Sequence, residues 1–292
     1  MEQRQARNQL QRGLTLGCVL SGLVASAGCW QPTQHTATPV PAARQHGEGR
    51  PFQFQPPLAL TSPDDAVVRI VSNGSVTCTG TLIADDRVLT AHHCVAEHDA
   101  RGRVQTRDIA PDGIQIELGG GDWPWGEVGV RAIVAPQCGF EWGDGDIAIL
   151  VLERHLIGMS TYTVSLEAAP QDKDEIKVFG FGRCALSPDA IHLRRGDGVI
   201  GSIAPGQFRA PASICPGDSG GPVKSSKDQI IGVISASVMD GDDRTKGASV
   251  FTRIDAWRQL FAAAEEISLG ASPSELPPYG DCHAPLPRPP AR

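Results

Sequence analysis

Apolar and polar positions alternate in short runs through the middle of the chain, and Gly, Asp and Pro separate these runs. Alternation over about four to eight residues, rich in Val and Ile, is typical of half-buried β-strands. The pattern predicts an all-β fold made of short strands. The expected strands are residues 66–71, 77–83, 87–91, 113–118, 128–135, 146–152, 175–182, 229–237 and 248–254.

One segment near the end of these runs has a strong helical period. Within "DAWRQLFAAAEEI", residues 255–267, four apolar side chains recur at i, i+3, i+4 and i+7, and they share one face of a helix. Asp255 is expected to act as a first-turn acid or N-cap. The order is many strands followed by a closing helix, with Trp257, Leu260, Phe261 and Ala264 facing the core.

Residues 1–28 have the pattern of a signal peptide. Basic residues precede the apolar run "LTLGCVLSGLVASAGC", which is too short to span a bilayer comfortably. Two cleavage sites compete. The small-x-small triplet at 25–27 suits ordinary signal peptidase, whereas "SAGC" resembles a bacterial lipobox in which Cys29 is acylated, although Ser26 stands where leucine is usual. Either site predicts an exported protein.

The number of cysteines bears on this choice. Cleavage after Ala27 leaves seven cysteines in an oxidising compartment, so one stays unpaired, whereas lipidation of Cys29 leaves six for three disulfides. The arithmetic favours a membrane-anchored bacterial lipoprotein over a freely secreted protein. The eight cysteines are Cys18, Cys29, Cys78, Cys94, Cys138, Cys184, Cys215 and Cys282.

Composition divides the rest of the chain. Residues 29–61 are rich in Pro, Thr and Gln and suit a tether, residues 62–270 form one folded unit, and residues 271–292 form a Pro-rich tail. The net charge of −7 provides no basic field, so nucleic acid is not an expected partner, and we expect a monomer. No CxxC spacing and no EF-hand loop occur, so neither a metal nor a cofactor is expected.

Two motifs carry histidine and serine chemistry. "LTAHHC" spans residues 89–94, and "CPGDSGGPV" spans residues 215–223. The second also satisfies the G-x-S-x-G turn of α/β-hydrolases, but that fold needs its histidine after the serine. Only His283 follows Ser219, inside the Pro-rich tail. The order of the motifs therefore excludes the α/β-hydrolase interpretation.

With "DIAIL" at 146–150 between them, these motifs resemble the three signatures of trypsin/chymotrypsin-like serine proteases. "TCTGTLI", "AIVAP", "GVISAS" and "VFTRI" match in the same order, so the resemblance covers about residues 64–268. It implies two antiparallel six-stranded Greek-key β-barrels with a C-terminal helix, and protein or peptide substrates cleaved in the cleft between barrels. The alternative is a tethered, non-catalytic protease-like binding module.

The resemblance also implies the catalytic residues. The family histidine directly precedes the cysteine, which makes His93 the general base and leaves His92 as a structural or surface side chain. Asp146 matches the aspartate that orients the histidine. Asp144, in the loop "WGDGD", is expected to be a solvated turn residue.

Ser219 matches the nucleophile of the family, and the N–H groups of Gly217 and Ser219 match its oxyanion hole. The S1 pocket, which receives the substrate side chain before the cut bond (P1), carries serine where trypsin-type enzymes have aspartate. This implies a small or medium apolar P1 side chain rather than a basic one. The implied pocket residues are Ser213 at the base, Ser237 and Ser249 on the walls, and Ser235, which also supports Asp146.

Disulfides follow from the same resemblance. A Cys78–Cys94 bridge would fix His93 and close a loop of 94 − 78 = 16 residues, which stabilises by about 3 kcal/mol in the chain-entropy model. The other four cysteines allow three pairings. The family fold favours Cys184–Cys215 and thereby Cys138–Cys282.

The family also buries the aspartate before the nucleophile, here Asp218, beside a cation that is usually a new N-terminal ammonium. "RIVSNG" at 69–74 resembles an activation site, but Ile70 lies only 78 − 70 = 8 residues before Cys78, so we interpret the segment as a barrel strand. An unpaired buried carboxylate is costly. Arg183 is the nearest cation in sequence and is predicted to pair with Asp218.

Overall fold

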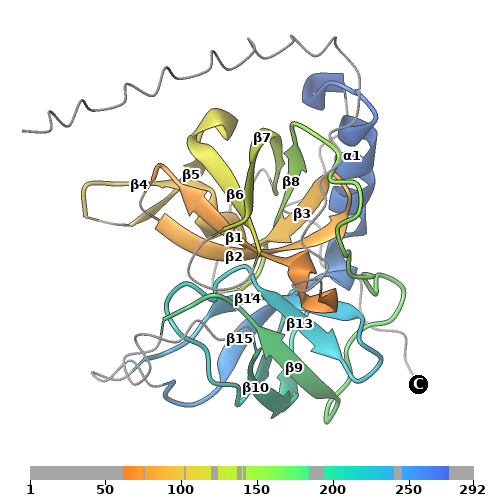
Figure 1. Ribbon diagram of the computed structural model, residues 1–292. Helices are drawn as coiled ribbons and strands as arrows, with labels where there is room; N and C mark the ends of the chain where they lie inside the picture. The colour runs from red at the N-terminus through yellow and green to blue at the C-terminus, as the bar shows by residue number, and fades with distance from the viewer. Residues whose placement is uncertain are drawn as a thin grey trace, which may run out of the picture. The chain divides into compact units, whose positions relative to one another are not determined.

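The computed structural model describes residues 62–74, 76–101, 103–119, 124–136, 140, 143–183, 194–239 and 245–275. Two antiparallel sheets and one C-terminal helix make up most of these ranges (Figure 1). The predicted all-β class with two barrels and a closing helix is therefore confirmed. The signal peptide, the tether, Cys29, Cys138, Cys184 and Cys282 lie outside the described residues.

The first sheet closes into a six-stranded barrel in the order β1-β2-β3-β8-β7-β6. Ile70 pairs with Cys78 on β2 and with Ile116 on β6, so residues 69–72 of "RIVSNG" lie in a barrel strand that is paired on both sides and not at a free end. The strands are β1 Val67–Ser72, β2 Val76–Ala84, β3 Arg87–Thr90, β6 Ile114–Leu118, β7 Gly126–Val134 and β8 Ala148–Leu152.

The second sheet, called the second barrel below, curls around its own apolar core and has seven strands where six were predicted, in the order β10-β9-β13-β14-β15-β12-β11. Phe208 and Phe251 are fully buried and stack with ring centroids 5.2 Å apart. The strands are β9 Glu175–Phe179, β10 Arg194–Val199, β11 Ser202–Ile203, β12 Gln207–Ala210, β13 Pro222–Ser225, β14 Ile230–Ala236 and β15 Ser249–Arg253.

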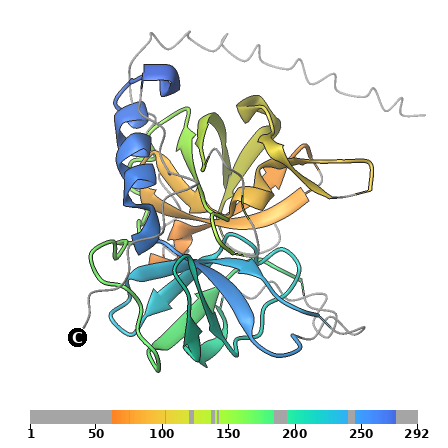
Figure 2. The same cartoon turned by 180° about the vertical axis from the view of Figure 1, so that it is seen from behind.

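The helix α1, Arg258–Ser268, packs beside the first barrel against β7 and β8, as both views show (Figures 1 and 2). Its buried face includes Leu260, Phe261 and Ala264, as predicted. Asp255 is not an N-cap but the first-turn acid of the 3₁₀ turn η5, Asp255–Trp257, which precedes the helix, and its carboxylate binds Arg253 at 2.6 Å. No described helix is long and apolar enough to cross a membrane.

Short elements complete the described chain. A two-stranded hairpin lies outside the first barrel, and Asp108 is the last residue of its second strand. The remaining elements are η2 Pro63–Ala66, η3 His92–Cys94, β4 Ala96–His98, β5 Val104–Asp108, η4 Pro111–Gly113 and η6 Pro273–Glu275.

Candidate active site

The short 3₁₀ turn η3 follows β3 and presents His93, and Asp146 comes just before β8, the neighbour of β3 in the barrel. Asp146 receives two hydrogen bonds from His93: ring Nδ1 lies 2.8 Å from Oδ2, and the backbone N–H donates to Oδ1 at 3.0 Å. Asp146 is 2 % exposed. Its bonds fix the orientation of the ring and assign the Nδ1 proton to the side facing Asp146.

The second barrel also holds Asp146. Ser235, on β14, donates its hydroxyl to Asp146 Oδ2, and Thr252, on β15, donates to the Asp146 carbonyl at 3.0 Å. Sequence reasoning identified Ser235 but missed Thr252, which lies in a strand of buried residues without any polar motif. A buried carboxylate with several donors stays ionised more readily than an unpaired one.

Burial and the ion pair act against each other on these two groups. Burial disfavours protonation of His93, but the charge and hydrogen bond of Asp146 favour it, and the net effect raises the pKa of His93. Burial also disfavours the Asp146 carboxylate, whereas His93 and Ser235 stabilise it, and the net effect lowers the pKa of Asp146. The Asp146 carboxylate therefore stabilises the protonated, positively charged form of the His93 imidazole.

Ser219 lies at the tight turn between the second barrel and η3. Its carbonyl oxygen accepts a hydrogen bond from Thr79 N–H at 2.8 Å and lies 3.6 Å from the sulfur of Cys94, the residue after His93. These contacts place the backbone of Ser219 beside the histidine turn. Asp146 reaches the same histidine turn through its hydrogen bonds to His93. Residues far apart in sequence therefore meet between the two sheets.

The residues before Ser219 form a β-turn, Cys215-Pro216-Gly217-Asp218, closed by a hydrogen bond from Asp218 N–H to the Cys215 carbonyl at 3.0 Å. Proline in second place and glycine with φ +98° in third place are the features of a type II turn. Among the described residues, neither Gly217 N–H nor Ser219 N–H donates a hydrogen bond. Within the described part of the chain, these two N–H groups are therefore available to an oxygen atom of a ligand.

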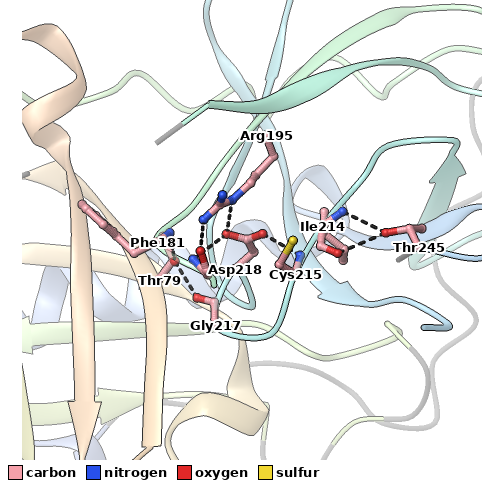
Figure 3. A network of polar contacts seen from close by, with 9 residues as sticks. Thr79, Phe181, Arg195, Ile214, Cys215, Gly217, Asp218 and Thr245 are labelled. Carbon is pink, nitrogen blue, oxygen red and sulfur yellow. Dashed lines mark hydrogen bonds and ion pairs between the residues drawn. The ribbon is translucent and has the colours of Figure 1, made fainter. Parts of the chain in front are cut away.

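Asp218 is fully buried and anchors this turn (Figure 3). Oδ1 accepts from Gly182 N–H at 2.7 Å and from the guanidinium Nε of Arg195 at 2.6 Å, and Oδ2 accepts from Cys215 N–H at 2.7 Å. Burial raises the pKa of Asp218, and the charge of Arg195 and the backbone donors oppose that rise. Both oxygens of the carboxylate therefore accept hydrogen bonds from groups within the domain.

The predicted pairing of Asp218 with Arg183 is wrong. Arg183 is exposed and contributes its backbone N–H, which donates to the Pro216 carbonyl at 2.9 Å. The cation is Arg195 on β10, which also donates to the Gly182 carbonyl. Its side chain is 4 % exposed.

A bulge explains why Arg195 reaches Asp218. The ladder between β10 and β9 pairs Arg194 with Phe179 and Gly196 with Val178, so Arg195 is the extra residue at a register shift. An extra residue bends the strand and turns its side chain to a new direction. No sequence pattern marks a bulge here, so Arg195 was missed.

Comparisons with known proteins identify the family of the chain. The sequence profile of the trypsin family, described as "Trypsin", matches residues 61–260, more than half of the chain. The chain belongs to the trypsin family. Among curated proteins it is similar to a vitellin-degrading protease of Bombyx mori, 28 % identical over 227 residues, which cover 66 % of this chain and 77 % of that protein.

Its fold is also that of solved trypsin-family structures. Neuropsin, described as a serine protease expressed in the limbic system of mouse brain, aligns with a TM-score of 0.55 at 19 % identity. The alignment covers 70 % of this chain and 97 % of neuropsin. The chain is thus a trypsin-like protease by family, and the likeness to neuropsin supports the two-barrel fold alone.

Four serines match the family's S1 region, and they differ in burial and in hydrogen-bond partners. Ser249 is fully buried and donates to the Ala212 carbonyl at 2.6 Å, and its hydroxyl lies 3.2 Å from that of Ser237. Ser213 is exposed, whereas the hydroxyl of Ser235 binds Asp146. Thr245, missed from sequence, bonds both the N–H and the carbonyl of Ile214 at 3.0 Å.

His92 belongs to a second, separate histidine–aspartate pair. The side chain is 2 % exposed, and Nε2 lies 2.6 Å from Asp108 Oδ1 at the end of β5. Nδ1 is buried and has no hydrogen-bond partner among the described residues. Phe140 lies against both imidazoles, with centroid distances of 5.2 Å to His92 and 6.1 Å to His93. His92 is therefore an internal structural side chain rather than a surface one.

The predicted Cys78–Cys94 disulfide is confirmed. Cys215 is also disulfide-bonded, but its predicted partner, Cys184, lies outside the described residues, as do Cys138 and Cys282. His93, Cys78 and Cys94 bring their ligand atoms within 4.8 Å of one another, yet the two sulfurs are bonded to each other. A disulfide offers no thiolate, so this group does not suit a metal.

Arg195→Gln tests the role of the buried cation. The variant leaves the Asp218 carboxylate buried with fewer donors, and we expect it to lower the free energy of unfolding by about 3–5 kcal/mol. Peptide hydrolysis should also fall, because the turn that carries Gly217 is held through Asp218. Denaturant unfolding and kinetics measure both effects. Arg209→Gln, at an exposed position of β12, is the control and should stay within about 0.5 kcal/mol; equal results for the two variants would contradict the assignment.

Proposed function

We propose that the protein is a serine endopeptidase that cleaves peptide bonds through an acyl-enzyme. Ser219 is the nucleophile, His93 is the general base, and Asp146 holds His93 in the required tautomer. The observation that carries the proposal is the 2.8 Å contact between His93 Nδ1 and Asp146, because it leaves Nε2 as the basic nitrogen beside the Ser219 turn.

The steps follow from these positions. His93 Nε2 takes the hydroxyl proton as Ser219 Oγ attacks the substrate carbonyl, and the negative oxygen is stabilised by the N–H groups of Gly217 and Ser219. His93 then gives the proton to the leaving amine, and the acyl-enzyme forms. Water, activated by His93 in the same way, releases the acid and regenerates Ser219.

The pocket serines support a small or medium apolar P1 side chain. Position 213 carries serine, so the proposed S1 pocket has no carboxylate there to pair with Arg or Lys. The hydroxyls of Ser237 and Ser249 lie 3.2 Å apart, and side chains at these two wall positions leave less room in the pocket. A basic P1 side chain would bury its charge unpaired, at a large cost in free energy.

Activation by a new N-terminus is not part of this proposal. Arg195 supplies the cation that Asp218 requires, at 2.6 Å and from within the domain. We expect a chain that begins near Thr61 and carries a blocked N-terminus to remain active. Activity that arises only after proteolysis at one specific bond would favour a zymogen.

Export and anchoring rest on the first 29 residues. We propose that the chain is a bacterial lipoprotein acylated at Cys29, with free secretion as the alternative. Cys29→Ser is expected to release the protein from membranes and abolish incorporation of labelled fatty acid. Mass spectrometry of the mature N-terminal peptide checks this directly: a wild-type peptide without an acyl group at Cys29 would exclude the lipoprotein.

The test of the activity is covalent labelling of the purified protein by a fluorophosphonate, with the modified residue located by peptide mass spectrometry. We expect one label, on Ser219. A panel of peptide substrates that differ only at P1 tests the pocket, and Ala or Val should be preferred over Arg and Lys. Absence of both labelling and hydrolysis would overturn the proposed function, and preference for Arg would overturn the pocket assignment alone.

A further inference from the structure

Thr79, on β2 of the first barrel, reaches into the turn that precedes Ser219. Its side chain is fully buried, and its hydroxyl oxygen lies 2.8 Å from the Gly217 carbonyl and 2.9 Å from Phe181 N–H (Figure 3). An N–H group can only donate, so the hydroxyl accepts from Phe181 and gives its own proton to Gly217. The direction of both hydrogen bonds is thereby determined.

The backbone of Thr79 is engaged with the same site. Its N–H donates to the Ser219 carbonyl at 2.8 Å, and its carbonyl accepts from the Thr90 hydroxyl at 2.9 Å. Thr79 therefore contacts the carbonyls of both residues whose N–H groups form the proposed oxyanion hole, Gly217 and Ser219. Of these two contacts, only the one to Gly217 depends on the side chain.

Contacts outside the turn decide where the Gly217 N–H points. Type I and type II turns differ in the direction of the central peptide, here Pro216–Gly217, and glycine tolerates the conformation that either type requires. Arg183 N–H holds the Pro216 carbonyl at 2.9 Å, on one side of Gly217. The Thr79 hydroxyl holds the Gly217 carbonyl on the other side.

We propose that Thr79 is a positioning residue for the oxyanion hole, and this role rests on the proposed peptidase function. The hydroxyl connects the strand β2 to a turn 138 residues later in the sequence, and with Phe181 it links three segments. Without it, among the described residues, the Pro216–Gly217 plane is held only by Arg183 N–H and the Gly217–Asp218 plane only by the bond to the Cys215 carbonyl. Both planes then have more freedom, and the Gly217 N–H group is aimed less well at the developing oxyanion. The loss falls on the transition state and not on substrate binding.

The test compares Thr79→Val, which keeps the shape but removes the hydroxyl, with Thr79→Ser, which keeps the hydroxyl. We expect kcat of Thr79→Val to fall about 10- to 100-fold with KM changed by less than about threefold, since loss of a whole oxyanion donor costs about 10²–10³ in kcat. Thr79→Ser should recover most of kcat.

Thr81→Val is the matched control on the same strand. Thr81 is also fully buried, but its hydroxyl has no hydrogen-bond partner among the described residues. Valine there removes only an unpaired hydroxyl, so kcat should stay within about twofold of wild type. The control separates the loss of a buried hydroxyl from the loss of its contact with Gly217.

A second readout separates positioning from a general loss of folding, because Thr79→Val leaves buried groups unpaired. Rates are expressed per site titrated with the fluorophosphonate, and inhibition by a peptide aldehyde, which forms a tetrahedral adduct with Ser219, is compared with KM of the matching peptide. In Thr79→Val, the affinity for the aldehyde should fall by about the same factor as kcat. If the wild type is labelled but Thr79→Val and Thr81→Val have the same kcat, or if Thr79→Val changes only KM, the positioning role of Thr79 is overturned and the peptidase function is not. If the wild type takes no label, both the peptidase function and this role are overturned.

Discussion

Ser219→Ala is expected to abolish fluorophosphonate labelling and to lower kcat for peptide hydrolysis by about 10⁶-fold. The hydroxyl is the atom that bonds to the substrate carbonyl, and no neighbouring group in the turn can replace it. Folding should be unaffected, because the contacts that hold the turn are made by the Ser219 carbonyl and by Asp218. Residual hydrolysis would come from the oxyanion donors and from substrate binding.

Labelling stoichiometry, peptide kinetics and thermal unfolding measure this prediction together. Ser202→Ala, at an exposed position of β11, is the control and should keep full labelling and turnover. Label retained by the Ser219 variant would require another nucleophile. A folded wild type that takes no label would favour the alternative of a tethered binding module with a protease-like fold.

The barrel strands could be predicted because each carries its own pattern. All nine predicted runs overlap strands, within a few residues at the ends. In β6, for example, the burial of Ile114, Ile116 and Leu118 follows the alternation visible in "GIQIEL". Such strands bury one face against the core, so apolar spacing along the chain reports their fold directly.

Other strands could not be recognised from such a pattern. β10, "RRGDGV", contains two glycines and three charged residues, and it becomes a strand because it pairs with β9 at the edge of the second sheet. β12 and β13 are only four residues long. Tertiary pairing outweighs weak local preference in such segments.

The site divides in the same way. Three motifs whose residue types and order are visible in the sequence contain His93, Asp146 and Ser219. In the structure, the ring of His93 is within hydrogen-bond distance of the Asp146 carboxylate, as expected. The groups that support them depend on register. Arg195 reaches Asp218 through a bulge, and Thr79 meets Gly217 from another sheet. Neither contact follows from spacing along the chain, because each needs the two sheets to be assembled first.

Asp146→Asn is expected to lower kcat/KM at neutral pH by about 10⁴-fold. The amide group can donate to His93 Nδ1, which favours the tautomer whose proton lies on Nε2 and so removes the base from the serine. The variant also loses the negative charge that stabilises the imidazolium formed during attack. Both effects act on the same 2.8 Å contact.

The pH dependence gives an independent check of the same pair. The unprotonated imidazole is the active form, so kcat/KM of the wild type should rise with pH through the pKa of His93, which lies above its ordinary value because of Asp146. Without that carboxylate, burial alone remains, and burial lowers the pKa of His93. The acid limb of the residual activity should therefore move to lower pH.

The neighbouring pair provides a matched control for this prediction. Asp108→Asn removes the carboxylate from His92 at a similar distance, 2.6 Å, but leaves the His93–Asp146 contact intact. It should keep most of the activity and the position of the acid limb. Asp144→Asn, at the exposed competitor two residues before Asp146, should behave likewise. A loss of activity in either variant as large as that in Asp146→Asn would show that the carboxylate serving the base has been misassigned.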